Sequence, residues 1–225
     1  MGVVLNFVLS QAIAIPIIVA LIRIKKIDKV YYPLLILLFI SLLSELASFI
    51  CINVFKTNAP VIKIYSLIEC IIILYQLYLW KNAASSRSMF IVLGLVCIVF
   101  WLVEVIVFKN INTFSPYFRV FYAFVIILLC INQINAMMFY HNVVLLKNPV
   151  FIICLAFIIC YLYQIIFEAS YFIGADKSVV AQEVANKIIM GFSYLNFLVN
   201  LMLAAGVYFM GGSKDDQYSH YFNGR

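Results

Sequence analysis

Four glutamates fall inside long apolar stretches of the sequence, where a charged side chain is costly. They are Glu45, Glu69, Glu104 and Glu168. A carboxylate near the middle of a membrane span costs about 2.5 to 3.5 kcal/mol on insertion scales, so such residues tend to face the interior of a helix bundle and to serve a function. The chemistry open to them is the binding of a proton, a cation or a small polar ligand.

Polar neighbours recur at helical spacing around these glutamates. Residues three, four or seven apart share one face of a helix, and a polar face within an apolar helix is expected to point into a bundle. The polar stripes are Ser41, Ser44, Glu45 and Ser48; Tyr65, Glu69 and Gln76; Arg119 and Tyr122; Tyr161, Gln164 and Glu168; and Ser193, Asn196 and Asn200.

The elements that must position these residues are apolar helices. The chain has 225 residues, of which 67% are hydrophobic and 11% charged, whereas soluble domains carry about 25% charged residues. A membrane-spanning helix needs about 20 apolar residues. Runs of that kind lie near residues 3–22, 30–53, 61–80, 89–108, 117–139, 149–173 and 187–210.

These runs predict an all-α membrane protein, a bundle of about seven transmembrane helices. Residues 1–210 would form one transmembrane domain and residues 211–225 a polar, flexible carboxyl-terminal tail. The loop GADKSVVAQEVANK before the last run is long enough to form a separate short helix at the membrane surface. The lipid bilayer is then the principal partner, and the expected location is the cell membrane, which is the inner membrane if the source is bacterial.

Basic residues suggest an orientation. The first connection, RIKKIDK, is the most basic stretch, and the positive-inside rule places such loops in the cytoplasm. The amino terminus is then outside and the carboxyl terminus cytoplasmic. In that orientation all four glutamates lie in the outer half, with Glu45 and Glu69 about 12 Å deep at about 1.5 Å per residue.

Two interpretations of these polar residues remain open. The first is a polar cavity, open to the outer side, that binds a small polar or cationic ligand or a proton. Its lining would be Glu45, Glu69, Glu168, Tyr65, Gln164 and Asn196. The second is a structural network that holds the helices together, with Glu104, nearest the interface, expected to be solvated. Its members would be Ser41, Ser44, Ser48, Glu104, Arg119, Lys187 and Asn200.

The usual signatures of other chemistry are missing from the sequence. Only two histidines exist, His141 and His220, and both lie in a loop or the tail, so no imidazole metal site within the bilayer is expected. The six cysteines show no zinc spacing. We find no HExxH or GxSxG motif and therefore predict no catalytic residues and no cofactor. The net charge is +6, but the basic residues lie at the ends of the apolar runs and do not form one patch. This distribution does not favour nucleic acid as a partner.

The segments SLLSELASF, KIYSLIEC, KNPVFIICLAF and NFLVNLMLAAG resemble a family of small seven-helix bacterial membrane proteins to which no activity is assigned. Seven spans with an outside amino terminus are also similar to microbial rhodopsins. Those proteins carry retinal on a lysine near the middle of the last span, where this chain reads SYLNFLVNLML. The resemblance therefore implies a fold and no cofactor.

The sequence favours a non-enzymatic sensor or receptor-like module. It would take a ligand, ion or proton from the outer side and transmit a helix rearrangement to a membrane or cytoplasmic signalling partner or within a homo-oligomer. The alternative is a small transporter or channel that uses the same carboxylates for cation or proton coupling. A further alternative is an oligomeric membrane-disrupting effector of a defence or toxin system, and an enzyme acting on lipid comes last.

Overall fold

The computed structural model describes residues 11–80, 87–107, 116–140, 145–174 and 179–210. Within these ranges all regular secondary structure is helical, with no strand, so the predicted all-α class is confirmed. The α-helices are α2 (Ala14–Arg23), α3 (Tyr32–Phe55), α4 (Ala59–Leu79), α5 (Arg87–Val107), α6 (Tyr117–Tyr140), α7 (Pro149–Gly174) and α8 (Val179–Phe209). Short 3-10 turns occupy Gln11–Ile13, Ile24–Lys26, Lys29–Tyr31 and Leu145–Lys147.

Six of these helices are long and apolar enough to cross a membrane. The candidate spans are Lys29–Phe55, Ala59–Leu79, Arg87–Val107, Tyr117–Met138, Pro149–Ser170 and Met190–Phe209. They agree with the second to seventh predicted runs and indicate a multi-pass membrane protein. Of the first predicted run, 3–22, residues 3–10 lie outside the described part, as does the predicted tail 211–225.

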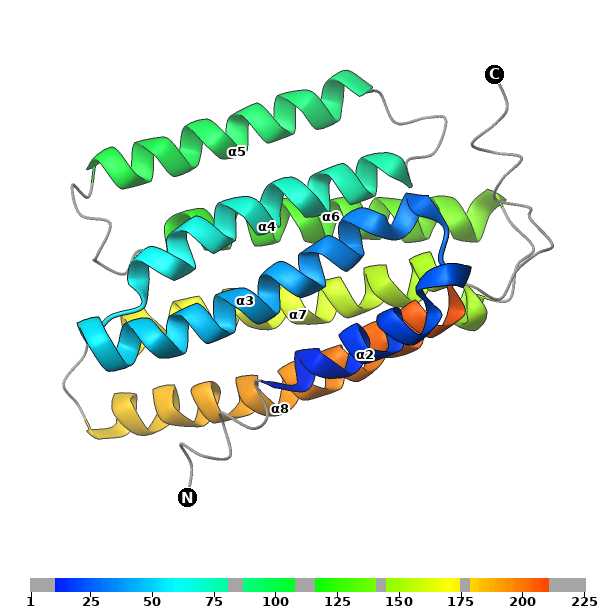
Figure 1. Ribbon diagram of the computed structural model, residues 1–225. Coiled ribbons are helices and arrows are strands. Elements are labelled where there is room, and N and C mark those ends of the chain that lie inside the picture. The colour runs from blue at the N-terminus through cyan, green and yellow to red at the C-terminus, as the bar shows by residue number, and fades with distance from the viewer. Residues whose placement is uncertain (1–10, 81–86, 108–115, 141–144, 175–178, 211–225) are drawn as a thin grey trace.

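The long helices run side by side, so the bundle has two ends (Figure 1). We call the end that carries residues 24–31 the basic end, and the end that carries residues 56–58 the far end. Helices α2, α3, α4, α6, α7 and α8 form a ring in which each packs against the next and α8 closes on α2. Helix α5 lies outside this ring against α4 and α6, and among its residues only Cys97 and Glu104 are buried.

Local sequence signals account for where the helices begin and end. Prolines lie in the first turn of α3 and α4 and at the first residue of α7, a position where the missing N–H has no helical partner to lose. Asn148 caps α7 because its Oδ1 accepts the Val150 N–H at 2.9 Å. Helix α3 ends at Lys56, whose φ of 60° is left-handed, the conformation that commonly terminates helices.

The separate surface helix predicted before the last span does not form as an independent element. Helix α8 instead runs without a break for 31 residues, from Val179 to Phe209. Residues 179–190 contain neither glycine nor proline, and Glu183 pairs with Lys187 one turn later at 2.8 Å, an arrangement that supports a continuous helix.

Helices α7 and α8 have the most extensive contact in the bundle. A Cβ added at Gly206 would lie 2.7 Å from Cγ1 of Ile153, and one added at Gly191 would collide with the Tyr163 hydroxyl. Glycine at these two positions therefore lets the helix backbones approach closely, as small residues do in membrane bundles.

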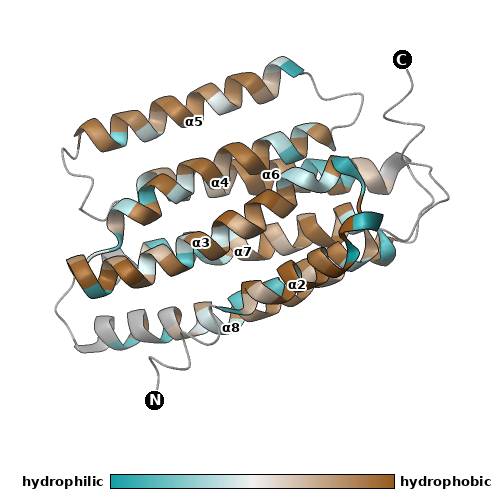
Figure 2. Cartoon of the chain, viewed as in Figure 1, coloured by the Kyte–Doolittle hydropathy of each residue, from teal (hydrophilic) through white to brown (hydrophobic). Residues whose placement is uncertain are grey.

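Polarity within the bundle differs between its two halves. Toward the basic end the ring is filled by aliphatic side chains, such as Leu34 and Leu38 of α3, Ile73 and Leu77 of α4, and Val207 of α8. The surfaces of the helices are largely hydrophobic along the bundle, and segment 24–31 is rich in hydrophilic residues (Figure 2). Toward the far end, buried charged side chains enter the core, namely those of Lys63, Glu104 and Glu168.

Candidate functional site

Glu69 of α4 receives hydroxyl hydrogen bonds from three tyrosines. The Tyr122 hydroxyl donates to Oε2 at 2.7 Å, and the Tyr161 and Tyr65 hydroxyls donate to Oε1 at 3.0 and 3.2 Å. The tyrosines come from α6, α7 and α4, so one carboxyl joins three helices. Glu69 is half-buried and lies ten residues after the start of its helix.

A second layer of polar groups fixes the direction of these hydrogen bonds. Ser41 Oγ of α3 lies 2.6 Å from the Tyr65 hydroxyl; because Tyr65 gives its proton to Glu69, Ser41 must be the donor in that pair. Gln164 Nε2 of α7 donates to the Tyr122 hydroxyl at 3.1 Å. We call Glu69, Tyr65, Tyr122, Tyr161, Ser41 and Gln164 the Glu69 cluster, and it connects four helices.

An ion pair between α6 and α7 lies on the far-end side of this cluster. Arg119 Nη1 is 2.8 Å from Glu168 Oε1. The Glu168 side chain has no exposed surface, and neither of its oxygens nor the buried Arg119 Nε has an aligned hydrogen-bond partner. Arg119 also interacts electrostatically with Glu69, so one cation acts on two carboxyls.

Glu104 performs a capping role at the far end. It is 6% exposed, and its Oε2 accepts a hydrogen bond from the Phe118 N–H in the first turn of α6. A carboxylate is favourable there because the first N–H groups of a helix lack partners and carry partial positive charge. The expectation of a solvated Glu104 is wrong, because α6 begins directly beside the end of α5.

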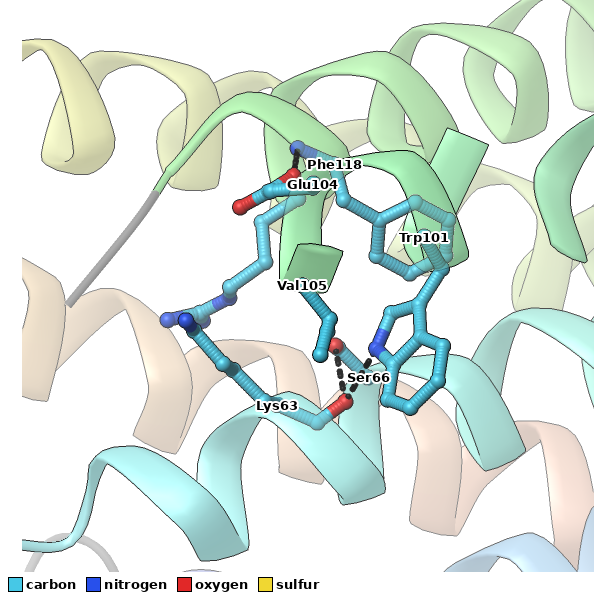
Figure 3. Close-up of a pocket in the computed structure, with 7 residues that line it drawn as sticks. Lys63, Ser66, Trp101, Glu104, Val105 and Phe118 are labelled. Carbon is cyan, nitrogen blue, oxygen red and sulfur yellow. Dashed lines mark hydrogen bonds between the residues drawn. The ribbon is translucent and has the colours of Figure 1, made fainter. Parts of the chain in front are cut away.

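A small cavity lies between the far ends of α4, α5 and α6. Its lining is Lys63, Ser66, Trp101, Glu104, Val105, Phe118 and Arg119, and six of these residues are labelled in Figure 3. The Lys63 carbonyl accepts hydrogen bonds from Trp101 Nε1 at 3.0 Å and from Ser66 Oγ at 2.9 Å. The volume of about 10 Å³ corresponds to about one water molecule. We call this space the end cavity.

Glu45, the remaining predicted ligand carboxylate, is not part of the Glu69 cluster. It shares a helix face with Leu38 and Ser41, yet it is exposed while Leu38 is buried. Its carboxyl forms no hydrogen bond or ion pair with another described residue. This face of α3 is therefore buried toward the basic end, at Leu38, and exposed toward the far end, at Glu45.

The other predicted residues are distributed as follows. Ser44 and Ser48 lie half-buried on α3, outside the hydrogen bonds described above. Asn196 and Asn200 bond to each other along α8, with Asn200 Nδ2 donating to the Asn196 carbonyl at 2.9 Å. Lys187 does not join the polar network, because it is 75% exposed and pairs with Glu183 on its own helix.

Two buried amides near the basic end hold helix termini. Gln76 Oε1 accepts the Leu34 N–H at 2.9 Å and its Nε2 donates to the Val30 carbonyl at 2.9 Å. Gln133 Nε2 donates to the Trp80 carbonyl at 2.8 Å. Each amide therefore satisfies main-chain groups that the end of a helix leaves without partners.

Sequence reasoning did not assign Tyr122, Tyr161, Lys63 or Trp101 to the site. Tyr122 lies three residues after Arg119 and Tyr161 three before Gln164, so helical spacing places both on the polar faces. Only the packing of α4 against α6 and α7 shows that both hydroxyls reach one carboxyl. Lys63 has no comparable signal, because its contact with Trp101 joins α4 to α5.

The described residues contain no group of three or more His, Cys, Asp or Glu side chains that could hold a metal ion. Comparison with known proteins finds no matching family model, no similar curated protein and no similar solved structure. The site must therefore be interpreted from its own geometry.

Proposed function

We propose that this chain is a non-enzymatic sensor-like membrane module that takes up a proton or a small cation at the Glu69 cluster. The observation that carries the proposal is the convergence of three tyrosine hydroxyls from three helices on one half-buried carboxyl. A change in charge at Glu69 alters every one of these bonds at once. The same event therefore acts on the packing of α3, α4, α6 and α7.

The charge balance favours a small positive species. The Glu69 cluster, the Arg119 pair and the end cavity together hold three carboxyls, Glu69, Glu104 and Glu168, and two basic groups, Lys63 and Arg119. When all five groups are ionised, their net charge is −1. Unpaired charge in a bundle core is costly, so a proton or small cation completes the site.

The proposed topology has seven spans, with the far end outside and the basic end in the cytoplasm. Lys25, Lys26, Lys29 and Lys147 are all exposed near the basic end, in agreement with the positive-inside rule. Labelling of a single cysteine introduced at Lys26, by a membrane-impermeant reagent, should occur only after the membrane is opened. Labelling of intact cells would reverse the orientation and place the site on the cytoplasmic side.

The transporter alternative needs a polar route from Glu69 to the basic end. The buried amides in that half are Gln76, Gln133, Asn148 and Asn200. The first three bond main-chain groups at helix ends, and Asn200 bonds Asn196 on its own helix. Aliphatic side chains fill the intervening core among the described residues. These contacts favour a binding and switching role over conduction, and a proton or cation flux in proteoliposomes that Glu69→Gln abolishes would reverse that preference.

A distance measurement tests the sensor proposal. Leu43 of α3 and Leu162 of α7 are 63% and 50% exposed, so each can be replaced by a noncanonical amino acid that carries a spin label. The distance between the two labels reports the separation of two helices that the Glu69 cluster joins. The wild-type distance distribution should change when the external solution is acidified, and Glu69→Gln should abolish the change. Glu183→Gln, in an exposed ion pair, is the matched control. An identical response in wild type and Glu69→Gln would refute the proposal.

A further inference from the structure

We infer that the end cavity is a water site through which protons enter from the far end and reach the carboxylate of the Arg119–Glu168 pair. This inference rests on the proposed function: it names the proton as the species taken up, the end cavity as its route, and Glu168, which is coupled to Glu69 through Arg119, as its acceptor. Three independent features of the described residues lead to it.

The first feature is the size and polarity of the end cavity. Its volume of about 10 Å³ admits about one water molecule and nothing larger. The ammonium of Lys63, the carboxyl of Glu104 and the guanidinium of Arg119 belong to residues on its wall. In Figure 3, Lys63 and Glu104 extend along one side while Trp101 closes the other. A water needs two to four polar partners, and this wall supplies them.

The second feature is a set of buried polar atoms without aligned partners. Arg119 Nε is inaccessible and has no aligned hydrogen-bond partner, and the two Glu168 oxygens have none beyond the ion pair of Oε1 with Arg119, whereas buried polar groups are nearly always hydrogen-bonded. Because Arg119 lines the cavity, a water there lies within reach of its guanidinium. The Arg119 side chain is 18% exposed, so the cavity region also has contact with the surroundings of the bundle.

The third feature is the position of Arg119 between two acidic centres. Its guanidinium is paired with Glu168 at 2.8 Å and acts electrostatically on Glu69. Arginine cannot itself release a proton in a protein, so the group that accepts the proton must be a carboxylate. A proton passes from the cavity water to the Glu168 carboxylate, which becomes a neutral carboxyl, and the water regains a proton from the far-end solution. The ion pair is then lost and Arg119 is free to act more strongly on Glu69.

Charged and titratable groups reach Glu69 from every helix packed around it, so the response belongs to the group as a whole. On α3 the nearest carboxyl-bearing residue along the chain is Glu45, one turn beyond Ser41. The other groups are Tyr65 and Cys70 of α4, Arg119 and Tyr122 of α6, and Cys160, Tyr161 and Glu168 of α7.

Filling the cavity without changing any charge tests the inference. Val105 lines the end cavity, and Val105→Phe would occupy it. After a rapid external acidification, the spin-label or an equivalent fluorescent distance signal between positions 43 and 162 should reach its wild-type amplitude at least tenfold more slowly in this variant. Val103→Phe is the matched control, because Val103 lies on the same helix and is 52% exposed.

The outcomes separate the two proposals. An unchanged rate in Val105→Phe, with normal folding by gel filtration and thermal unfolding, would overturn the entry route while leaving the sensor proposal intact. A wild-type signal that does not depend on Glu69 would overturn both. If Val105→Phe does not fold, Val105→Leu adds a single methylene and should slow the response by a smaller factor; an unchanged rate in that variant would overturn the route equally.

Discussion

Arg119 and Glu168 form an ion pair of 2.8 Å between α6 and α7, and the Glu168 side chain has no exposed surface. Removing one partner of such a pair leaves an uncompensated charge in the bundle, which costs about 3 to 5 kcal/mol. Replacing both partners with apolar residues of similar size avoids that cost. The pair is therefore expected to matter for stability chiefly when one member is lost.

The first prediction follows from this asymmetry. Arg119→Leu should lower the free energy of unfolding by about 3 to 5 kcal/mol, and Arg119→Leu combined with Glu168→Leu should recover most of that loss. Unfolding in mixed detergent micelles measures both. Lys187→Leu, in an exposed pair, is the control and should change the stability little. A double variant less stable than either single variant would contradict the expectation.

The second prediction concerns the tyrosines around Glu69. Interhelical hydrogen bonds in membranes average about 0.6 kcal/mol and reach about 1.7 kcal/mol. Tyr122→Phe should fall at the upper end, because Tyr122 is fully buried and its hydroxyl donates to Glu69 at 2.7 Å, whereas Tyr65 is half-buried. Tyr65→Phe, with the longer 3.2 Å bond, should cost less. Tyr75→Phe, at an exposed position of α4, should have no effect; the reverse order would show that these bonds do not set the stability of the cluster.

The third prediction concerns the contact between α7 and α8. Gly206→Ala should destabilise the bundle by about 1 to 3 kcal/mol, the usual cost of overpacking, because the new Cβ would meet Ile153 Cγ1 at 2.7 Å. Gly94→Ala should be neutral or stabilising by up to about 1 kcal/mol, since nothing lies within 4 Å of a Cβ there. Combining Gly206→Ala with Ile153→Ala, which removes the Cγ1 atom, should cost less than the sum of the two single changes, and equal effects at the two glycines would refute the close approach.

The fourth prediction concerns Gln76 at the basic end. Gln76→Met keeps the side-chain length but leaves the Leu34 N–H and the Val30 carbonyl without their partner. An unsatisfied buried polar group costs about 1 to 3 kcal/mol, so the variant should unfold more readily and amide exchange at Leu34 should accelerate. Asn132→Met, at an exposed site on α6, is the control. Unaltered exchange at Leu34 would show that Gln76 does not secure the start of α3.

Amino-acid sequence by itself determined the helical class, the positions of six long apolar helices and the faces on which polar residues lie. These properties are local, because about 20 apolar residues define a span and a spacing of three or four defines a face. The sequence also singled out Glu69, Glu168, Arg119 and Gln164, since a charge or an amide within an apolar run is conspicuous on its own.

Only the tertiary structure decided which polar residues meet. Glu69 and Glu168 lie on polar faces that look alike in the sequence, yet one is held by tyrosines and the other by Arg119. Glu45 stays apart because α3 is open toward the far end, and Glu104 caps α6 because two helix ends adjoin. Which polar residues contact each other depends on the distances and rotations between helices. These are fixed by contacts such as that of Gly206 with Ile153, and such contacts produce no periodic pattern in the sequence.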